Sequence, residues 1–258
     1  MVQSNTGKGT EKRTKDAAEP EEIIPLRKRL IAELIGTFAL VFAAVGSDAA
    51  DVISGHEIGK FAIAAAPGLV VAAMTYAVDK ISGAYFNPAI TMGFTATGHL
   101  KLQELPLYII VQVVGAMAAS AIVFLAIAPP NAENIGLTLP RTGWLNSFVL
   151  ELVLTFFLMF IGISLKERIG YKPFGGIAIG AFITAAGIIG IPVSGGSMNP
   201  ARSFGPALVS LNLSYEWIYW IAPIIGAILA VLCFRAIKDH RVERISNSGH
   251  DGDEEKRL

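Results

Sequence analysis

Long apolar stretches separated by short polar segments make up most of this 258-residue chain. A helix needs roughly 20 residues to cross the hydrocarbon core of a bilayer, and six stretches approach that length. They are Leu30–Gly46, Phe61–Val78, Leu105–Ile127, Leu145–Leu165, Phe174–Ile191 and Ile218–Ala236. Several are rich in Gly and Ala, which allow helix backbones to approach closely within lipid. The pattern predicts an all-α membrane protein with six transmembrane helices.

Two further apolar segments are too short to span a bilayer. They are "NPAITMGFTAT" at 87–97 and "NPARSFGPALV" at 199–209. Asn is a favoured N-cap and Pro a favoured first helical residue, so each segment is predicted to begin a helix at its Asn-Pro. At about 1.5 Å per residue such a helix covers about half of a 30 Å core. We therefore expect two re-entrant half-helices.

The chain also contains an internal repeat. "AELIGTF" at 32–38 returns as "LELVLTF" at 150–156, which aligns Glu33 with Glu151, and the two Asn-Pro-Ala runs are offset by 112 residues. The repeats cover about 27–127 and 144–236. Three spans per repeat is an odd number, so the two halves enter the membrane from opposite sides. The expected fold is an inverted repeat whose half-helices meet tip to tip at the midplane.

Charged residues gather at the two ends of the chain. Only 16% of the residues are charged and the net charge is zero, which gives no argument for a nucleic-acid partner. If both ends lie on one side, all but three of the 21 Lys and Arg lie there too, the exceptions being Lys60, Arg141 and Arg202. The positive-inside rule then predicts cytoplasmic termini. We expect tails at 1–26 and 237–258 around a membrane domain at 27–236.

The tips of the two half-helices suggest the chemistry. A helix N-terminus behaves like roughly half a positive charge, so two facing tips repel a cation while the Asn amides can donate to a neutral oxygen. Arg202 follows Asn199 by three residues on the same helix face, and an intramembrane arginine is usually functional. Glu33 and Glu151 are expected to be buried acceptors that hold the backbone of the loops. Together these features favour a pathway for a small neutral solute.

Other classes of function fit the sequence less well. A proton relay needs a chain of titratable groups, which the spans hardly supply. An ion-coupled transporter can share broken helices and inverted repeats, but it needs a coupling-ion site that two positive tips disfavour. An enzyme would need a nucleophile–base pair or metal ligands at depth, yet no His lies within a span. The single Cys233 excludes an intrachain disulfide. We expect a protein without catalytic activity, metal or cofactor.

The paired boxes, Asn87-Pro88-Ala89 and Asn199-Pro200-Ala201, are followed by Arg only in the second. Together with the Glu-x-x-x-Thr-Phe repeat starts, they resemble the aquaporin or major intrinsic protein family. The resemblance covers about Arg27 to Ala236. It implies a homotetramer in the lipid bilayer of the plasma membrane, with one pore per subunit. It also implies passive conduction of water and small neutral solutes, with exclusion of protons.

The family has a four-membered outer constriction that can be placed by spacing from the boxes. The four positions are Pro67, Gly187, Gly196 and Arg202. An insertion or deletion in one helix would replace Pro67 by Ala66, or Gly187 by Ile188. The set Pro67, Gly187, Gly196 and Arg202 implies a filter wider and less polar than that of a strict water channel.

Other positions leave the preferred solute open. Ser203 and Ala207 replace the Asp and the basic residue that glycerol facilitators carry, and Tyr219-Trp220 resembles the aromatic pair of water channels. In contrast, "PVSGGSMNPARSFGPA" is similar to a nodulin-like plant branch whose members can pass metalloid hydroxides. A channel dominated by water and a facilitator of glycerol, urea or boric acid therefore both remain open.

Overall fold

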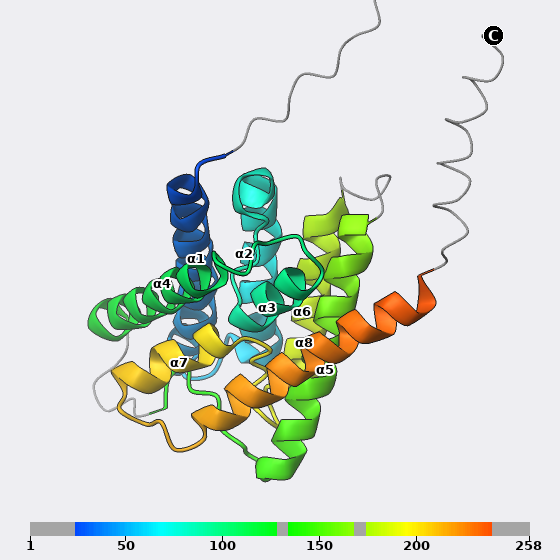
Figure 1. Ribbon diagram of the computed structural model, residues 1–258. Coiled ribbons are helices and arrows are strands. Elements are labelled where there is room, and N and C mark those ends of the chain that lie inside the picture. Colours follow the sequence, from blue (N-terminus) through cyan, green and yellow to red (C-terminus); the bar gives the residue numbers. More distant parts are fainter. Residues whose placement is uncertain (1–23, 128–133, 168–173, 239–258) are drawn as a thin grey trace, which may run out of the picture.

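A computed structural model describes residues 24–127, 134–167 and 174–238. In these ranges the chain forms eight helices and no strand (Figure 1). The helices are α1 (Leu26–Ile53), α2 (Gly59–Ser82), α3 (Pro88–Ala96), α4 (Leu105–Ala126), α5 (Trp144–Glu167), α6 (Gly175–Gly190), α7 (Pro200–Val209) and α8 (Glu216–Ile237). The predicted all-α fold, with its spans and two short helices, is confirmed.

Helix length separates two groups of spans. Within the described residues, α1, α2, α4, α5 and α8 are long and apolar enough to cross a membrane, whereas α6 has 16 residues. At 1.5 Å per residue α6 covers about 24 Å. It begins just after residues 168–173, which lie outside the described residues, as do most of the two expected tails (1–23 and 239–258).

The first span is longer than the apolar pattern predicted. We expected it to end at Gly46, but α1 continues to Ile53. The last turns of α1, residues 47–53, include polar residues, so the apolar pattern stops before the helix does. The Asp51 carboxylate closes this end, since it accepts the Gly59 N–H at 2.8 Å and lies 2.8 Å from the His56 ring nitrogen Nδ1. The helix therefore continues for about two turns beyond the apolar residues that predicted it.

Ion pairs gather at one end of the bundle, which we call the tail side because α1 begins and α8 ends there (Figure 1). The pairs are Arg29 with Glu104, Asp79 with Lys166, and Glu167 with Lys238. They join the starts of α1 and α4 and the ends of α2, α5 and α8. The opposite end, the far side, carries the α1–α2 turn, the loop 134–143 and the start of α8.

The two half-helices point to opposite sides. Both begin as predicted, because the side-chain oxygen of Asn87 accepts the Ala89 N–H at 2.9 Å and that of Asn199 accepts the Ala201 N–H at 3.0 Å. The last residue of α3, Ala96, lies on the tail side, where its carbonyl accepts a hydrogen bond from the α8 side chain Arg235. α7 instead ends shortly before the start of α8, on the far side. The repeat is therefore inverted in space.

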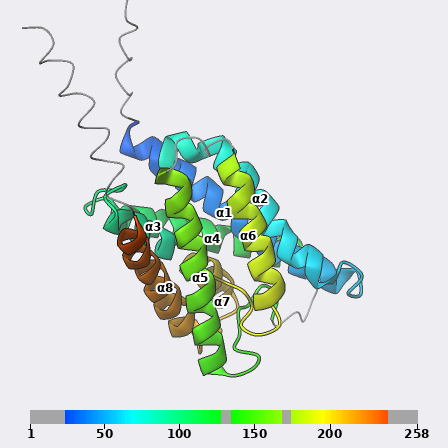
Figure 2. The ribbon, with the colours of Figure 1, turned by 90° about the vertical axis from the view of Figure 1, so that its right-hand side faces the viewer.

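Equivalent helix crossings in the two halves depend on glycine. A Cβ at Gly115 on α4 would lie 2.6 Å from the Leu34 carbonyl oxygen of α1, and one at Gly226 on α8 would lie 2.2 Å from that of Leu152 on α5. Figure 2 shows α5 and α8 side by side. Since a real side chain cannot occupy that distance, both crossings require backbone-to-backbone contact.

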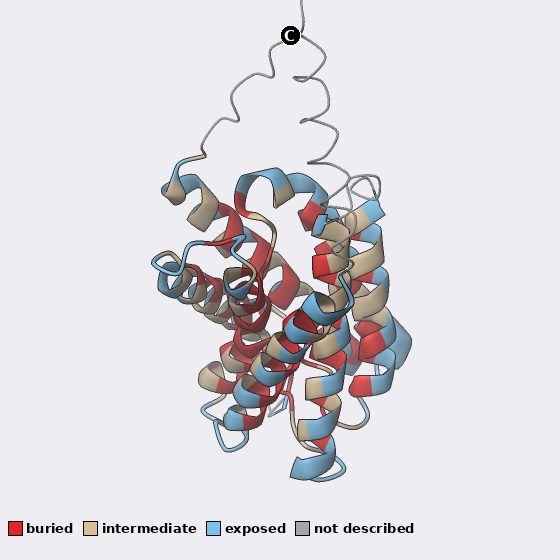
Figure 3. Ribbon diagram, turned by 45° about the vertical axis from the view of Figure 1, so that its right-hand side comes forward, coloured by how far each residue is buried: buried red, intermediate tan, exposed pale blue. Residues whose placement is uncertain are grey.

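A third close contact joins the halves through α2 and α6. A Cβ at Gly180 would lie 2.4 Å from the Gly68 carbonyl oxygen. Outside these contacts the helices expose large apolar side chains, among them Phe61, Leu69 and Leu125 at 69%, 68% and 88% exposure. Figure 3 shows buried residues toward the inside of the bundle and exposed ones along the outer faces. An apolar surface of this extent fits contact with lipid.

Candidate functional site

A buried carboxylate holds the loop that leads into α3. Glu33 is fully buried on α1 and points both oxygens at this loop. It accepts hydrogen bonds from Ser82 Oγ at 2.7 Å, Tyr85 N–H at 3.0 Å, Phe86 N–H at 2.8 Å and Gln112 Nε2 at 2.8 Å. Four donors around one carboxylate compensate for its burial.

The second half repeats this arrangement with Glu151 on α5, which is also fully buried. Its carboxylate accepts hydrogen bonds from Ser194 Oγ at 2.7 Å, Ser197 N–H at 2.8 Å and Met198 N–H at 2.6 Å. These donors correspond to Ser82, Tyr85 and Phe86 of the first half, each offset by 112 residues. The two loops are therefore fixed by the same chemistry.

Directly before each Asn, the chain adopts a left-handed conformation. Phe86 has φ of 51° and Met198 has φ of 54°, values that cost free energy in any residue with a side chain. Their backbones are held from both sides. Each N–H donates to a glutamate, and each carbonyl accepts a hydrogen bond from the opposite box. Asn87 Nδ2 donates to Met198 O at 2.7 Å, and Asn199 Nδ2 donates to Phe86 O at 2.8 Å.

These reciprocal bonds determine what the two boxes can offer a solute. A carboxamide NH₂ has two N–H donors, and in each Asn one of them is used by the opposite loop. The carboxamide oxygen is used as well, because it caps its own helix. Among the described residues each Asn therefore has a second N–H without a protein acceptor, and it acts toward a solute as a hydrogen-bond donor.

A cavity of about 770 Å³ extends through the bundle beside these groups. It is lined on the tail side by Asp79, Lys80, His99 and Lys166, in the middle by Asn87 and Asn199, and on the far side by Asp48, Arg141 and Arg202. Most of the remaining lining is apolar and comes from α1, α2, α5 and α6. A pathway with polar ends and a donor-bearing middle suits a small solute that forms hydrogen bonds.

The four predicted constriction positions, Pro67, Gly187, Gly196 and Arg202, all line this cavity. Ile188, the alternative to Gly187, is 47% exposed on the outer face of α6 and does not line it, and neither does Ala66. Three of the four positions thus have no side chain that reaches far into the space. Arg202 is the exception.

Arg202 is anchored from outside its own helix. Its Nη1 donates to the carbonyl oxygen of Gly136 at 2.5 Å, and the Gly136 N–H donates to Asp48 Oδ2 at 2.7 Å. Nothing in the sequence pattern indicated this contact. Gly136 comes from a connecting loop with no periodic pattern, and Asp48 was expected to lie beyond the end of the first helix.

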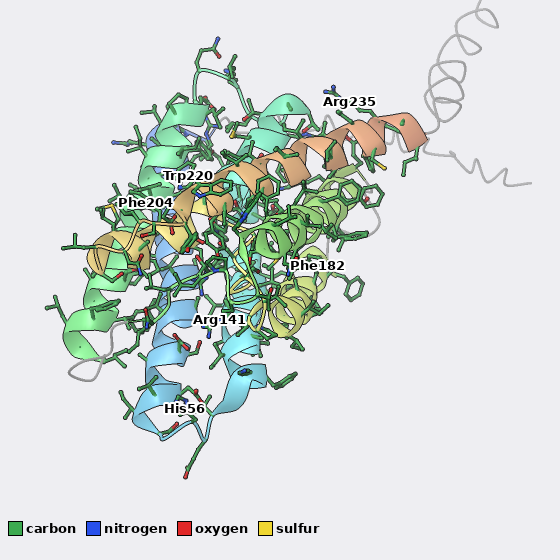
Figure 4. All side chains as sticks on the ribbon, turned by 90° about the horizontal axis from the view of Figure 1, so that it is seen from below. His56, Arg141, Phe182, Phe204, Trp220 and Arg235 are labelled. Carbon is green, nitrogen blue, oxygen red and sulfur yellow. The ribbon has the colours of Figure 1, made fainter. Side chains whose placement is uncertain are left out.

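The markers that left the preferred solute open lie behind the cavity wall. Ser203 is buried and bonds Thr138 Oγ1 and Ser197 Oγ, at 2.8 and 2.5 Å. Trp220 packs edge to face on Phe204 (Figure 4). None of Ser203, Ala207, Tyr219 and Trp220 is among the residues that line the cavity. Within the described residues they support the half-helix and its loop, and they do not contact the pathway.

A model of the major intrinsic protein family matches residues 22–234. The chain belongs to this family. It is 38% identical over 217 residues to "Aquaporin NIP1-1" of Zea mays, covering 83% of this chain and 76% of that one. It is 38% identical to "Nodulin-26" of Glycine max over 217 residues, covering 83% and 79%.

This major intrinsic protein also has a solved structural neighbour, the aquaglyceroporin from Plasmodium falciparum. The TM-score is 0.71 at 21% sequence identity, and the match covers 83% of this chain and 97% of the neighbour. The similarity confirms the fold. Together with the family assignment, it identifies the chain as a multi-pass membrane protein.

Proposed function

We propose that this protein is a passive channel that conducts water and small uncharged solutes and excludes protons and ions. The observation that carries the proposal is the middle of the cavity. There, two helix N-termini from opposite sides each present an Asn N–H that has no protein acceptor among the described residues, and the polar oxygens nearby are already bonded. A neutral solute with an oxygen acceptor can replace its water contacts at this point.

Electrostatics opposes cations along the same path. Each half-helix contributes roughly half a positive charge at its N-terminus, and Arg202 adds a full one nearer the far side. A cation would lose hydration and meet repulsion at both places. A water molecule or a polyol loses little, because hydrogen bonds to N–H groups replace those to solvent.

A wide filter is the second part of the proposal. Gly187 and Gly196 line the cavity without side chains, and the ring of Pro67 is apolar. This observation favours admission of solutes larger than water, such as glycerol, urea or boric acid. The relative from Zea mays is named an aquaporin and the structural neighbour an aquaglyceroporin. Both a preference for water and a preference for glycerol are therefore kept in the proposal.

The distribution of carboxylates argues against an ion-coupled transporter. Among the described residues, the acids that line the cavity are Asp48 and Asp79, at its two ends. Glu33 and Glu151 lie at mid-depth, but their oxygens are occupied by loop N–H and hydroxyl groups. No carboxylate is thus left at the midplane of this part of the chain to bind a coupling ion.

The proposal also covers the topology of the channel, its oligomeric state and the membrane that holds it. The basic residues on the tail side support cytoplasmic termini by the positive-inside rule. Exposed apolar faces on the outer helices suit both lipid and neighbouring copies, which supports a homotetramer with one pore in each subunit. We place it in the plasma membrane.

Stopped-flow measurements on proteoliposomes containing the full chain test the proposal. Water, glycerol and urea fluxes are compared in one preparation against empty vesicles, with an entrapped pH dye for protons. We expect water and glycerol to exceed the background and protons not to. Absence of both fluxes would refute the channel function.

The filter is tested by the substitution Gly187→His. A Cβ at this position would lie 3.0 Å from the Cβ of Ala64 on α2, and both residues line the cavity. An imidazole ring there has to take space from the cavity, so glycerol flux should fall about tenfold relative to water flux, a ratio typical of steric discrimination by a pocket. Ile188→His is the matched control, since it places the same ring one residue further on the outer face. An unchanged flux ratio in Gly187→His would remove Gly187 from the filter.

A further inference from the structure

Asp48 is an acidic residue in the wall of the channel. It lies on α1 one turn beyond Ala44 and two turns beyond Leu40, and all three residues line the cavity. Its carboxylate is therefore on the pathway face of a membrane helix. An ionisable group in such a position is costly and is usually functional.

Asp48 and Arg202 are joined through a single residue. Gly136 donates its N–H to Asp48 Oδ2 and accepts a hydrogen bond from Arg202 Nη1 on its carbonyl. Only glycine fits between them. Gly136 has φ of 71°, and a Cβ there would lie 2.7 Å from the Val45 side chain. The loop thus packs directly on α1 and brings an acid and a base to the same end of the cavity.

The other acids near Arg202, Glu151 and Glu216, do not line the cavity. Glu151 is turned to the loop 194–198, and Glu216 at the start of α8 is absent from the cavity wall. Arg141 lines the far side but is exposed, so solvent screens it. Figure 4 shows Arg141 on the far side, nearer the middle of the bundle than His56. Asp48 is therefore the acid that faces Arg202 within the cavity.

We propose that Asp48 is a further specificity-determining residue, whose negative charge cancels that of Arg202 at the far-side mouth and thereby excludes anions. This inference rests on the proposed function. With Arg202 alone, the mouth and the two helix tips form a continuous positive path, which rejects cations but attracts anions. The Asp48–Arg202 pair makes the mouth neutral, so that both signs of charge are rejected.

The substitution Asp48→Asn tests the charge while it retains an oxygen for the Gly136 N–H. Full-length protein is reconstituted with an entrapped halide-sensitive dye, and chloride influx is recorded. We expect wild-type vesicles to match empty ones and Asp48→Asn to exceed them about tenfold or more, as one uncompensated charge in a medium of intermediate dielectric implies. Asp48→Glu, which keeps the charge, should exclude chloride. Chloride influx of Asp48→Asn at the wild-type level would overturn the inference.

Asp51→Asn is the matched control. It removes the same charge from the same helix, but Asp51 does not line the cavity. We expect its chloride influx to equal that of the wild type. An influx as large as that of Asp48→Asn would show a general effect of removing an acid from this end of α1 and would also overturn the inference.

A second experiment removes the positive charge of Arg202 instead of the negative charge of Asp48, so the inference does not depend on Asp48→Asn alone. Arg202→Gln leaves the Asp48 carboxylate without the cation that faces it within the cavity, so proton influx should rise, and adding Asp48→Asn should abolish that rise. A double variant that leaks as much as Arg202→Gln, or an Arg202→Gln variant that does not leak, would count against Asp48. Water flux is measured in every preparation. A wild-type protein without water flux would refute the proposed function. The inference about Asp48 is tested by the ion fluxes of those variants that still conduct water.

Discussion

Glu151→Gln changes one atom in the network that holds the second half-helix loop. The carboxylate accepts three hydrogen bonds, from Ser194, Ser197 and Met198, at 2.6 to 2.8 Å. All three partners are donors. The NH₂ of glutamine cannot accept a bond, so at least one donor must face another donor.

The cost can be worked out from these contacts. Losing one hydrogen bond to a charged acceptor costs roughly 1.5–3 kcal/mol, and the two that remain weaken to neutral ones. The loss of a buried charge offsets part of this. We expect a net destabilisation of about 2 kcal/mol, which in a protein of this size lowers the melting temperature by about 5 °C.

Glu216→Gln is the matched control. Glu216 Oε2 is buried and has no hydrogen-bond partner among the described residues. Replacing this carboxylate by an amide removes a buried charge without breaking a bond, so the melting temperature should stay the same or rise. The two substitutions are chemically identical. The sites differ in the partners of the side chain, and Glu216 is only partly buried whereas Glu151 is fully buried.

Thermal unfolding in detergent, followed by tryptophan fluorescence, measures both variants. Single-channel water permeability in proteoliposomes then shows whether the loop has moved. Glu151→Gln melting at the wild-type temperature would refute the argument from donors. An equal fall in Glu216→Gln would show that any loss of a buried glutamate is harmful, whatever its partners.

Two further predictions concern packing and pH. Gly226→Ala should destabilise the protein by about 3 kcal/mol, because the new Cβ would lie 2.2 Å from a backbone carbonyl oxygen of α5. Gly46→Ala should be neutral or stabilising, because the nearest atom to its new Cβ lies at 3.8 Å. Thermal unfolding measures both variants. Burial lowers the pKa of the His99 imidazole below its usual 6.5, so the folded state loses stability as the pH falls from 6.5 through that lower value. His99→Gln should reduce the difference in melting temperature between pH 7.5 and 5.5, and an unchanged difference would contradict this.

The half-helices were predictable because their signals are local. Asn87 and Asn199 each supply a cap, and the proline that follows supplies the first turn, so a few residues determine where each helix starts. The pairing of Glu33 with Glu151 was visible because the repeat placed a glutamate at the same point of each half. Neither inference required knowledge of distant contacts.

The far-side mouth could not be predicted in the same way. Asp48 follows the last apolar residues of its span, and an apolar pattern says nothing about where a helix stops once it leaves the hydrocarbon. Gly136 lies in a loop whose position depends on packing against α1. Spacing from the boxes made Gly187 a candidate filter position, and the residue lines the cavity. Its close approach to Ala64 on α2 is a contact between the two halves that spacing could not indicate.

The reciprocal bonds between the boxes also constrain how the protein can be made. Phe86 O receives its hydrogen bond from Asn199, and Asn87 Nδ2 finds its acceptor on Met198, partners 113 and 111 residues further along the chain. During synthesis the first re-entrant loop therefore lacks these two partners until the ribosome has produced most of the second repeat. The first three spans can insert early, but the pore is completed only when the second box reaches the first.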